Sequence, residues 1–138
     1  MARVTGIGGF FFRALDPDAL NRWYADHFGI VMTESRTYDD PGWFQERGET
    51  IISACSVDSD MFGSLAKSWM INFRVDDLDA MVQNLRAAGV AVVTHDESYP
   101  NGRFAELRDP EGNRIQLWEP NAAAIARDPR GRASSRST

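Results

Sequence analysis

The sequence predicts an α+β protein in which two βαβββ units form a curved mixed sheet, a cup with the helices on its outside. Three observations predict this fold: a strand–helix pattern that occurs twice, short alternating runs after each helix, and turn sequences between those runs. The units span about residues 4–60 and 66–120, so residues 1–120 form a single domain.

Each unit begins with an alternating strand followed by an acid that caps a helix. Residues 12–16 lead into the first helical pattern, and residues 73–77 lead into the second, sixty-one positions later. Both segments end in Asp, a favoured N-cap, and Pro17 suits the first position of a helix. Gly29 and Gly89 follow the helical patterns, where a left-handed residue often ends a helix.

Short strand-like runs follow each helix. The turn over residues 109–112 has Pro second and Gly fourth, a type I hairpin signature. Residues 58–67 read as a linker between the units. The expected strands after the helices are 31–36, 43–46 and 50–55 in the first unit, and 90–94, 103–108 and 114–119 in the second.

The amino-acid composition excludes several classes of function for this protein. The chain has 15 basic and 20 acidic residues, a net charge of −5 that argues against a nucleic-acid or acidic-membrane binder. Its one cysteine, Cys55, excludes an internal disulfide and a cysteine-rich zinc site. We expect a cytoplasmic protein because that thiol is unpaired and no apolar run is long enough to span a membrane. Residues 121–138 contain four Arg and one Asp, and we expect a basic, flexible tail.

Alternation along the expected strands predicts a face that mixes polar and aromatic side chains. Asn72 and Arg74 oppose Ile71 and Phe73, and Gln116 and Trp118 oppose their apolar neighbours in the last strand. Curled into a cup, such a face forms a cleft with apolar walls and polar anchors, whereas a solvated sheet face is the alternative. The expected ligand-binding residues are Phe11, Arg13, Trp69, Asn72, Arg74 and Trp118.

Glu106 is the one carboxylate in the middle of a second-unit strand, and it is a candidate general base if it faces the cleft. Alternation groups it with Phe104 and Arg108 but leaves open which side that group faces. Of the two histidines, His27 fits a packing or capping role at the end of the first helix, and His95 fits a solvated loop.

The repeated units, the segment RVDDLDAMVQNLRAAGV and the segment GRFAELRDPEGNRIQLWEP resemble the vicinal oxygen chelate superfamily over about residues 4–120. That group includes glyoxalase I, extradiol dioxygenases and bleomycin-resistance proteins. The resemblance implies metal-ligand positions at Gly9, Ile52, Met70 and Gln116, where the metal enzymes carry His, Gln or Glu. Only Gln116 offers a suitable donor, so we expect no metal and no other cofactor. Arg13 matches the position of an anion-contacting arginine in glyoxalase I-like proteins.

Three functions follow from these features. The first is a bleomycin-resistance-like protein that binds a small molecule in a cleft with a degenerate metal site. The alternative is a glyoxalase-like lyase, isomerase or dioxygenase acting on a small oxygenated metabolite, with Glu106 or Gln116 as the catalytic group. The third is an interaction domain with a vestigial pocket. We expect a homodimer, because members of the superfamily build the cup either within one chain or between two.

Overall fold

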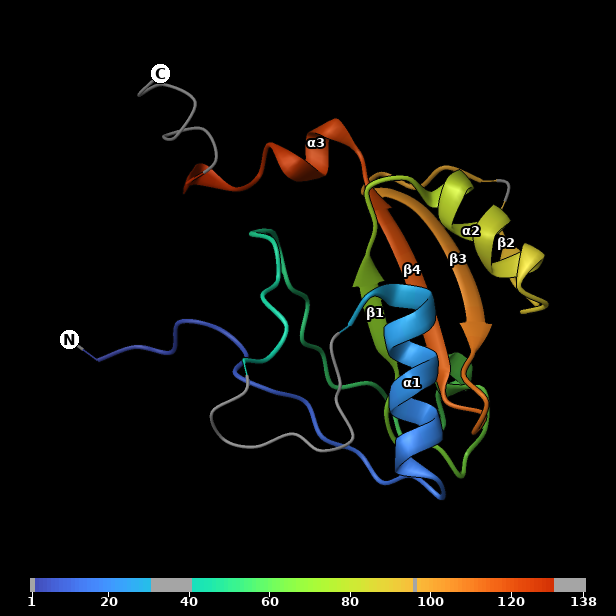
Figure 1. Cartoon of the computed structure of the whole chain (residues 1–138). Helices are drawn as coiled ribbons and strands as arrows, with labels where there is room; N and C mark the ends of the chain where they lie inside the picture. The colour runs from blue at the N-terminus through green and yellow to red at the C-terminus, as the bar shows by residue number, and fades with distance from the viewer. Residues whose placement is uncertain (1, 31–40, 96, 131–138) are drawn as a thin grey trace.

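The structure is a computed structural model that describes residues 2–30, 41–95 and 97–130. Four strands form one sheet in the order β1-β4-β3-β2, with β1 parallel to β4 and the other pairs antiparallel. The helices α1 and α2 lie on the same side of this sheet (Figure 1). The elements in chain order are α1 (Pro17–Phe28), η1 (Asp60–Phe62), β1 (Ile71–Arg74), α2 (Leu78–Ala87), β2 (Val93–Thr94), β3 (Gly102–Arg108), β4 (Arg114–Pro120) and α3 (Ala122–Ile125).

Both long helices begin and end where their sequences predict. The Asp16 carboxylate accepts a hydrogen bond from the Ala19 amide, and the Asp77 carboxylate accepts one from the Ala80 amide, so each acid satisfies a free amide at its helix start. Gly29 ends α1 with φ 68°, a left-handed conformation that favours glycine.

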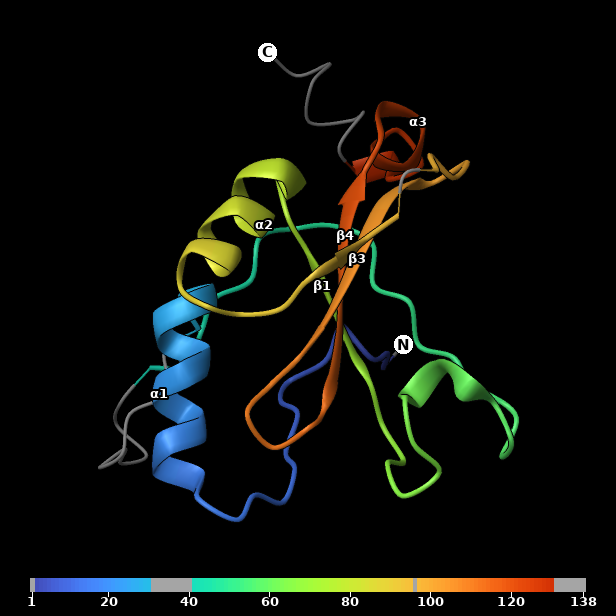
Figure 2. The same cartoon turned by 90° about the vertical axis from the view of Figure 1, so that its right-hand side faces the viewer.

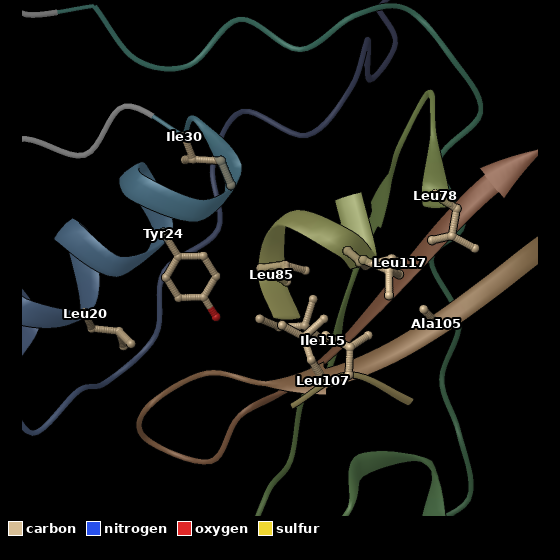
Figure 3. Close-up of a cluster of buried hydrophobic side chains, with 11 residues drawn as sticks. Leu20, Tyr24, Ile30, Leu78, Leu85, Ala105, Leu107, Ile115 and Leu117 are labelled. Carbon is tan, nitrogen blue, oxygen red and sulfur yellow. The ribbon is translucent and has the colours of Figure 1, made fainter. Parts of the chain in front are cut away.

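The hydrophobic core lies between the helices and the sheet (Figure 3). Leu20 and Tyr24 from α1 and Leu85 from α2 face Ile115 and Leu117 from β4. Because alternate residues of a strand point to opposite faces, all odd-numbered positions of β1, β3 and β4 lie on this helix-covered side. The even-numbered positions form the opposite face of the sheet.

A buried polar network ties α1 to the β3–β4 hairpin. The Tyr24 hydroxyl donates to Asp109 Oδ2 (2.7 Å), and the Asn113 amide group donates to the same oxygen (2.8 Å). Burial, together with the hydrogen bond and the negative charge of Asp109, raises the pKa of Tyr24 far above its usual value. On the hairpin, the Glu111 carboxylate accepts from the backbone amides of Leu15 and Asp16 (2.7 and 3.0 Å). These bonds fix the start of α1 against a turn near the end of the chain.

The structure confirms the α+β class and the mixed sheet of the second unit, whereas the described part of the first unit contains the helix α1 and no strand. Residues 2–16 and 41–59 contain no strand, so the strands expected at 43–46 and 50–55 are not formed there. The run at 31–36 lies outside the described residues. Alternation predicts a half-buried strand but cannot supply the neighbouring strand that its backbone must pair with, and these segments pair with no strand among residues 2–30, 41–95 and 97–130.

Residues 121–130, the described part of the expected tail, pack against the end of the sheet. The Asn121 side chain caps α3 by accepting from the Ala124 amide (2.9 Å), and Ala124 is buried. The Asn121 amide group also donates to the Pro100 carbonyl (3.0 Å), which anchors the segment near the start of β3. Within the described residues, no helix is both long enough and apolar enough to cross a membrane.

Candidate functional site

The face of the sheet opposite α1 and α2 carries a row of polar side chains. Strand register aligns Asn72 of β1 with Gln116 of β4, and Gln116 with Glu106 of β3. The Asn72 Nδ2 donates to Gln116 Oε1 at 2.8 Å, so the two amides are oriented by each other. This row crosses three adjacent strands on the side of the sheet that holds η1 (Figure 2), and we call it the polar row.

Glu106 therefore faces the same side as Gln116, which answers the question that alternation alone left open. Its carboxylate forms an ion pair with Arg114 Nη2, and its Oε1 lies 3.6 Å from His95 Nε2. The Glu106 side chain is 22% exposed, so the group is partly sheltered and still reachable from solvent. A carboxylate beside an imidazole can accept or relay a proton.

His95 is predicted from the sequence to lie in a solvated loop, and its contact with Glu106, like the pair between Arg114 and Glu106, is not among the predictions. The signal was available in the type I turn at 109–112, because a hairpin closed there sets Glu106 opposite Gln116 and next to Arg114 on the same face. Placing His95 required the β2–β3 pairing as well, which aligns Val93 with Glu106. His95 lies two residues after Val93, so its side chain is on the same face of the sheet as Val93 and Glu106.

Arg74, Trp118 and Phe104 form a second aligned row beside the polar row. Trp118 is only 4% exposed, its ring stacks on Phe104 at 6.3 Å and 7°, and its Nε1 donates to the Asn101 carbonyl (2.9 Å). The indole is therefore part of the wall beneath the face rather than an open stacking surface.

Arg74 holds a loop over one end of the face. Its Nη1 and Nη2 donate to the backbone carbonyls of Glu49 (2.5 Å) and Glu46 (2.8 Å). The guanidinium lies so close to Gly48 that a Cβ at that residue would be 2.5 Å from Arg74 Nη1. Nη1 and Nη2, the groups of Arg74 expected to hold a ligand, are thus bonded to the protein. Arg74 therefore positions the loop that forms the wall of the site.

Two ion pairs join the same loop to the C-terminal segment: the loop supplies the carboxylate of one pair and the arginine of the other. Arg127 Nη2 lies 2.7 Å from Glu49 Oε2, and Arg47 Nε lies 3.5 Å from Asp128 Oδ2. Arg130 also contacts Asp128 and lowers the pKa of that carboxyl. Residues 127–128 thus help to fix the loop that Arg74 contacts.

The remaining expected ligand residues lie elsewhere. Trp69 packs against Phe10 (5.2 Å) and Phe12 (4.8 Å), in an aromatic cluster that extends to Tyr24 on the helix side. Phe11 is 92% exposed, and Arg13 is exposed in the same extended segment. The structure therefore brings together Glu106, Gln116, Asn72, Arg74 and Trp118, and it does not bring Phe11, Arg13 or Trp69 to them.

The residues at the superfamily's metal positions do not fit a divalent ion. Gly9 has no side chain, Ile52 has an aliphatic one, and Met70 offers only a thioether, a weak donor for hard cations. The Gln116 carbonyl oxygen already accepts from Asn72. Over the described ranges, no cluster of three or more His, Cys, Asp or Glu side chains could hold a metal ion.

The chain is similar to known proteins in sequence and in fold. Its sequence matches the glyoxalase-like domain over residues 9–118, which is most of the molecule. The chain belongs to the glyoxalase-like domain family. This membership confirms the resemblance to the vicinal oxygen chelate superfamily. No curated protein matches this family member at a significant level.

Two solved structures share the fold of this glyoxalase-like chain over most of their length. TnmS3, an antibiotic binding protein from Streptomyces sp. CB03234, has a TM-score of 0.58 and 23% identity, covering 88% of this chain and 100% of TnmS3. A lactoylglutathione lyase from Agrobacterium tumefaciens has a TM-score of 0.52 and 24% identity, covering 86% of this chain and 96% of the lyase. At these identities the likeness shows the fold and leaves the activity to be argued from the site.

A third similar structure is a glyoxalase/bleomycin resistance protein from the same Streptomyces strain. It is 38% identical, but the match covers only 36% of this chain and 45% of that protein, with a TM-score of 0.33. The chain therefore spans less than half the length of this relative.

Proposed function

We propose that this glyoxalase-like protein binds a small organic molecule on the polar face of its sheet and does so without metal chemistry. The observation that carries the proposal is the Asn72–Gln116 amide pair (2.8 Å), in which Gln116 stands at a position where the resemblance implies a metal ligand. Amides present both donors and acceptors, so the pair suits a ligand rich in hydroxyl, carbonyl or amide groups. That one structural neighbour is described as an antibiotic binding protein supports a binding role.

We propose that the first unit completes the cup, either within one chain or from the partner of a homodimer. In support, β1 is an edge strand of the described sheet, and large apolar side chains of residues 2–57 are exposed. Exposed strand-forming segments of this kind are usually covered by pairing. Sedimentation equilibrium of the purified protein tests the dimer: we expect twice the mass of the 15.4 kDa chain, and a monomer at micromolar concentration would contradict it. We also propose a cytoplasmic location, because the one cysteine, Cys55, is exposed and unpaired.

A ligand screen tests the binding role. Small aromatic and anionic metabolites are screened by thermal shift, and hits are titrated calorimetrically against wild type, Asn72→Ala and Asn84→Ala. We expect Asn72→Ala to weaken binding about tenfold, the effect of one lost hydrogen bond. Asn84→Ala makes the same change at an exposed site on α2 and should bind as wild type does. If wild type and Asn72→Ala bound every hit with equal affinity, the polar row would not be the binding site.

Elemental analysis tests the metal-free part of the proposal. Protein purified without chelators should contain no stoichiometric divalent ion. A content near one zinc, iron, nickel or manganese ion per chain would show that other residues form a metal site.

The contact between His95 and Glu106 favours one alternative, a glyoxalase-like lyase or isomerase in which Glu106 is the general base. Wild-type protein would then convert a hit into product, and Glu106→Gln would abolish turnover while retaining binding. Incubation of each hit with wild type, followed by mass spectrometry, separates an enzyme from a binding protein. We expect the hits to be recovered unchanged.

A further inference from the structure

A concave site lies on the helix-covered side of the sheet, between α2 and the strands β2 and β3. It is a groove of about 480 Å³. Its lining includes one apolar side chain, the buried Val82, and the polar side chains of Asp79, Gln83, Arg86, Thr94 and Arg103. Thr94 and Arg103 point away from the polar row, because they occupy the opposite alternation class of β2 and β3.

The two arginines of the groove are held in place by contacts within the protein. Arg86 Nη2 donates to the Val92 carbonyl at 2.9 Å, which fixes its guanidinium at the groove. Arg103 forms a two-pronged pair with Asp79, at 3.3 Å and 2.7 Å. Side chains that are already ordered lose less conformational entropy when a ligand binds.

The lining of the groove includes two arginines and one carboxylate, Asp79, in a chain with a net charge of −5. Arg103 is paired with Asp79 and lies 4.0 Å from Glu119 Oε2, so Arg86 is the cation of the lining that no carboxylate contacts among the described residues. Within the part of the chain that the structure describes, Arg86 Nε and Nη1 have no protein partner. Gln83 and Thr94 add a neutral amide and a hydroxyl that can donate to the same ligand.

We propose that this groove binds an oxyanion, the carboxylate or phosphate group of a small molecule. Arg86 supplies the main contact, because the second N–H of Nη2, which Val92 does not use, forms a planar donor pair with the N–H of Nε or of Nη1 that suits two oxygens. Asp79 limits the affinity by competing for Arg103. The proposal does not rest on the proposed function, since the polar row lies on the other side of the sheet. His95 borders the groove and also contacts Glu106, so it is left unchanged in the test.

The test uses the full chain, with inorganic phosphate and acetate as probes and chloride at matched ionic strength as the reference. Amide chemical shifts are followed by NMR during each titration. In wild type we expect saturable shifts at the groove residues, with a Kd on the order of 1 mM for the stronger probe. Stronger binding of phosphate assigns the groove to phosphorylated ligands, and equal or stronger binding of acetate assigns it to carboxylates. Shifts that are linear, or that chloride reproduces, would overturn the proposal.

Two substitutions with matched controls complete the test. Asp79→Asn removes the carboxylate closest to Arg103, leaving the longer contact with Glu119 (4.0 Å), and should tighten binding of the stronger probe about fivefold, a gain that a merely destabilised variant cannot produce. Asp18→Asn makes the same change in the first turn of α1 and should have no effect. Arg86→Ala should weaken binding at least fivefold, whereas Arg130→Ala, which removes the same charge from the C-terminal segment, should not. Unchanged affinity in Asp79→Asn would refute the assigned contacts.

Discussion

Replacing Tyr24 with Phe removes a single buried hydrogen bond and keeps the packing of the ring. The Tyr24 hydroxyl lies 2.7 Å from Asp109 Oδ2, and both residues are buried between α1 and the β3–β4 hairpin. The Asp109 carboxylate keeps three other bonds, from the Asn113 amide group (2.8 Å) and from the backbone amides of Glu111 and Asn113 (2.9 and 3.0 Å). The cost of Tyr24→Phe is therefore that of one bond to a charged acceptor, about 2 kcal/mol.

Urea unfolding measures this cost directly. With an m-value of about 2 kcal/mol/M, a loss of about 2 kcal/mol lowers the unfolding midpoint by about 1 M at unchanged m. Tyr99→Phe is the matched control, because Tyr99 is exposed and its hydroxyl is outside this network. If Tyr24→Phe lowered the free energy of unfolding by less than about 0.5 kcal/mol, the bond would contribute no more than an average surface contact, and the reasoning would be refuted.

The free energies of unfolding of wild type and Tyr24→Phe should depend differently on pH. Because the folded state raises the pKa of Tyr24, the native protein keeps the phenolic proton at pH values where the unfolded chain releases it, above about pH 10. The unfolded state then binds fewer protons, so stability falls as pH rises, by up to about 1.4 kcal/mol per pH unit. Tyr24→Phe lacks this component. The difference in unfolding free energy between the two proteins should therefore be constant from pH 7 to 9 and shrink above pH 10, and parallel profiles up to pH 11 would contradict the assignment.

Two further predictions concern the edges of the site. Gly102→Ala should destabilise the protein by about 4 kcal/mol in urea, because the added Cβ would lie 2.1 Å from the Glu119 carbonyl oxygen at a residue with φ 135°; a loss below about 1 kcal/mol would show that the strand shifts easily. Arg127→Glu should speed amide hydrogen exchange at Gly48, because it breaks the pair with Glu49 that holds the loop. Adding Glu49→Arg restores an opposite-charge pair and should restore protection, and failure of this rescue would mean that the pair does not hold the loop.

Local sequence signals predicted the second unit well because its elements are defined by neighbours in the chain. The Asp77 cap, the alternation in β1 and the type I turn each act over a few residues, and together they set which side chains share a face. They predicted that Asn72, Arg74 and Gln116 lie together, and the register of the turn also fixes Glu106 beside them. Family membership was readable from the same segment.

The remaining features depend on contacts between distant parts of the chain, which alternation cannot reveal. Tyr24 and Asp109 are 85 positions apart, and nothing in either local sequence indicates that they meet. Arg74 was expected to bind a ligand, yet the carbonyls of a loop from the first half occupy two of its nitrogens. Trp69 shares the alternation class of Phe73, so its position in the helix-side cluster, away from the polar row, agrees with the strand pattern.

The bonds from Glu111 to the amides of Leu15 and Asp16 constrain the order in which a nascent chain can fold. They join groups 96 and 95 positions apart, so α1 has no docking partner for its first turn until the hairpin at 109–113 has left the ribosome. An isolated helix of 12 residues is only marginally stable in water. During synthesis the apolar face of α1 therefore stays exposed until most of the chain has emerged. If translation is arrested before residue 109, chaperones should be able to bind that face.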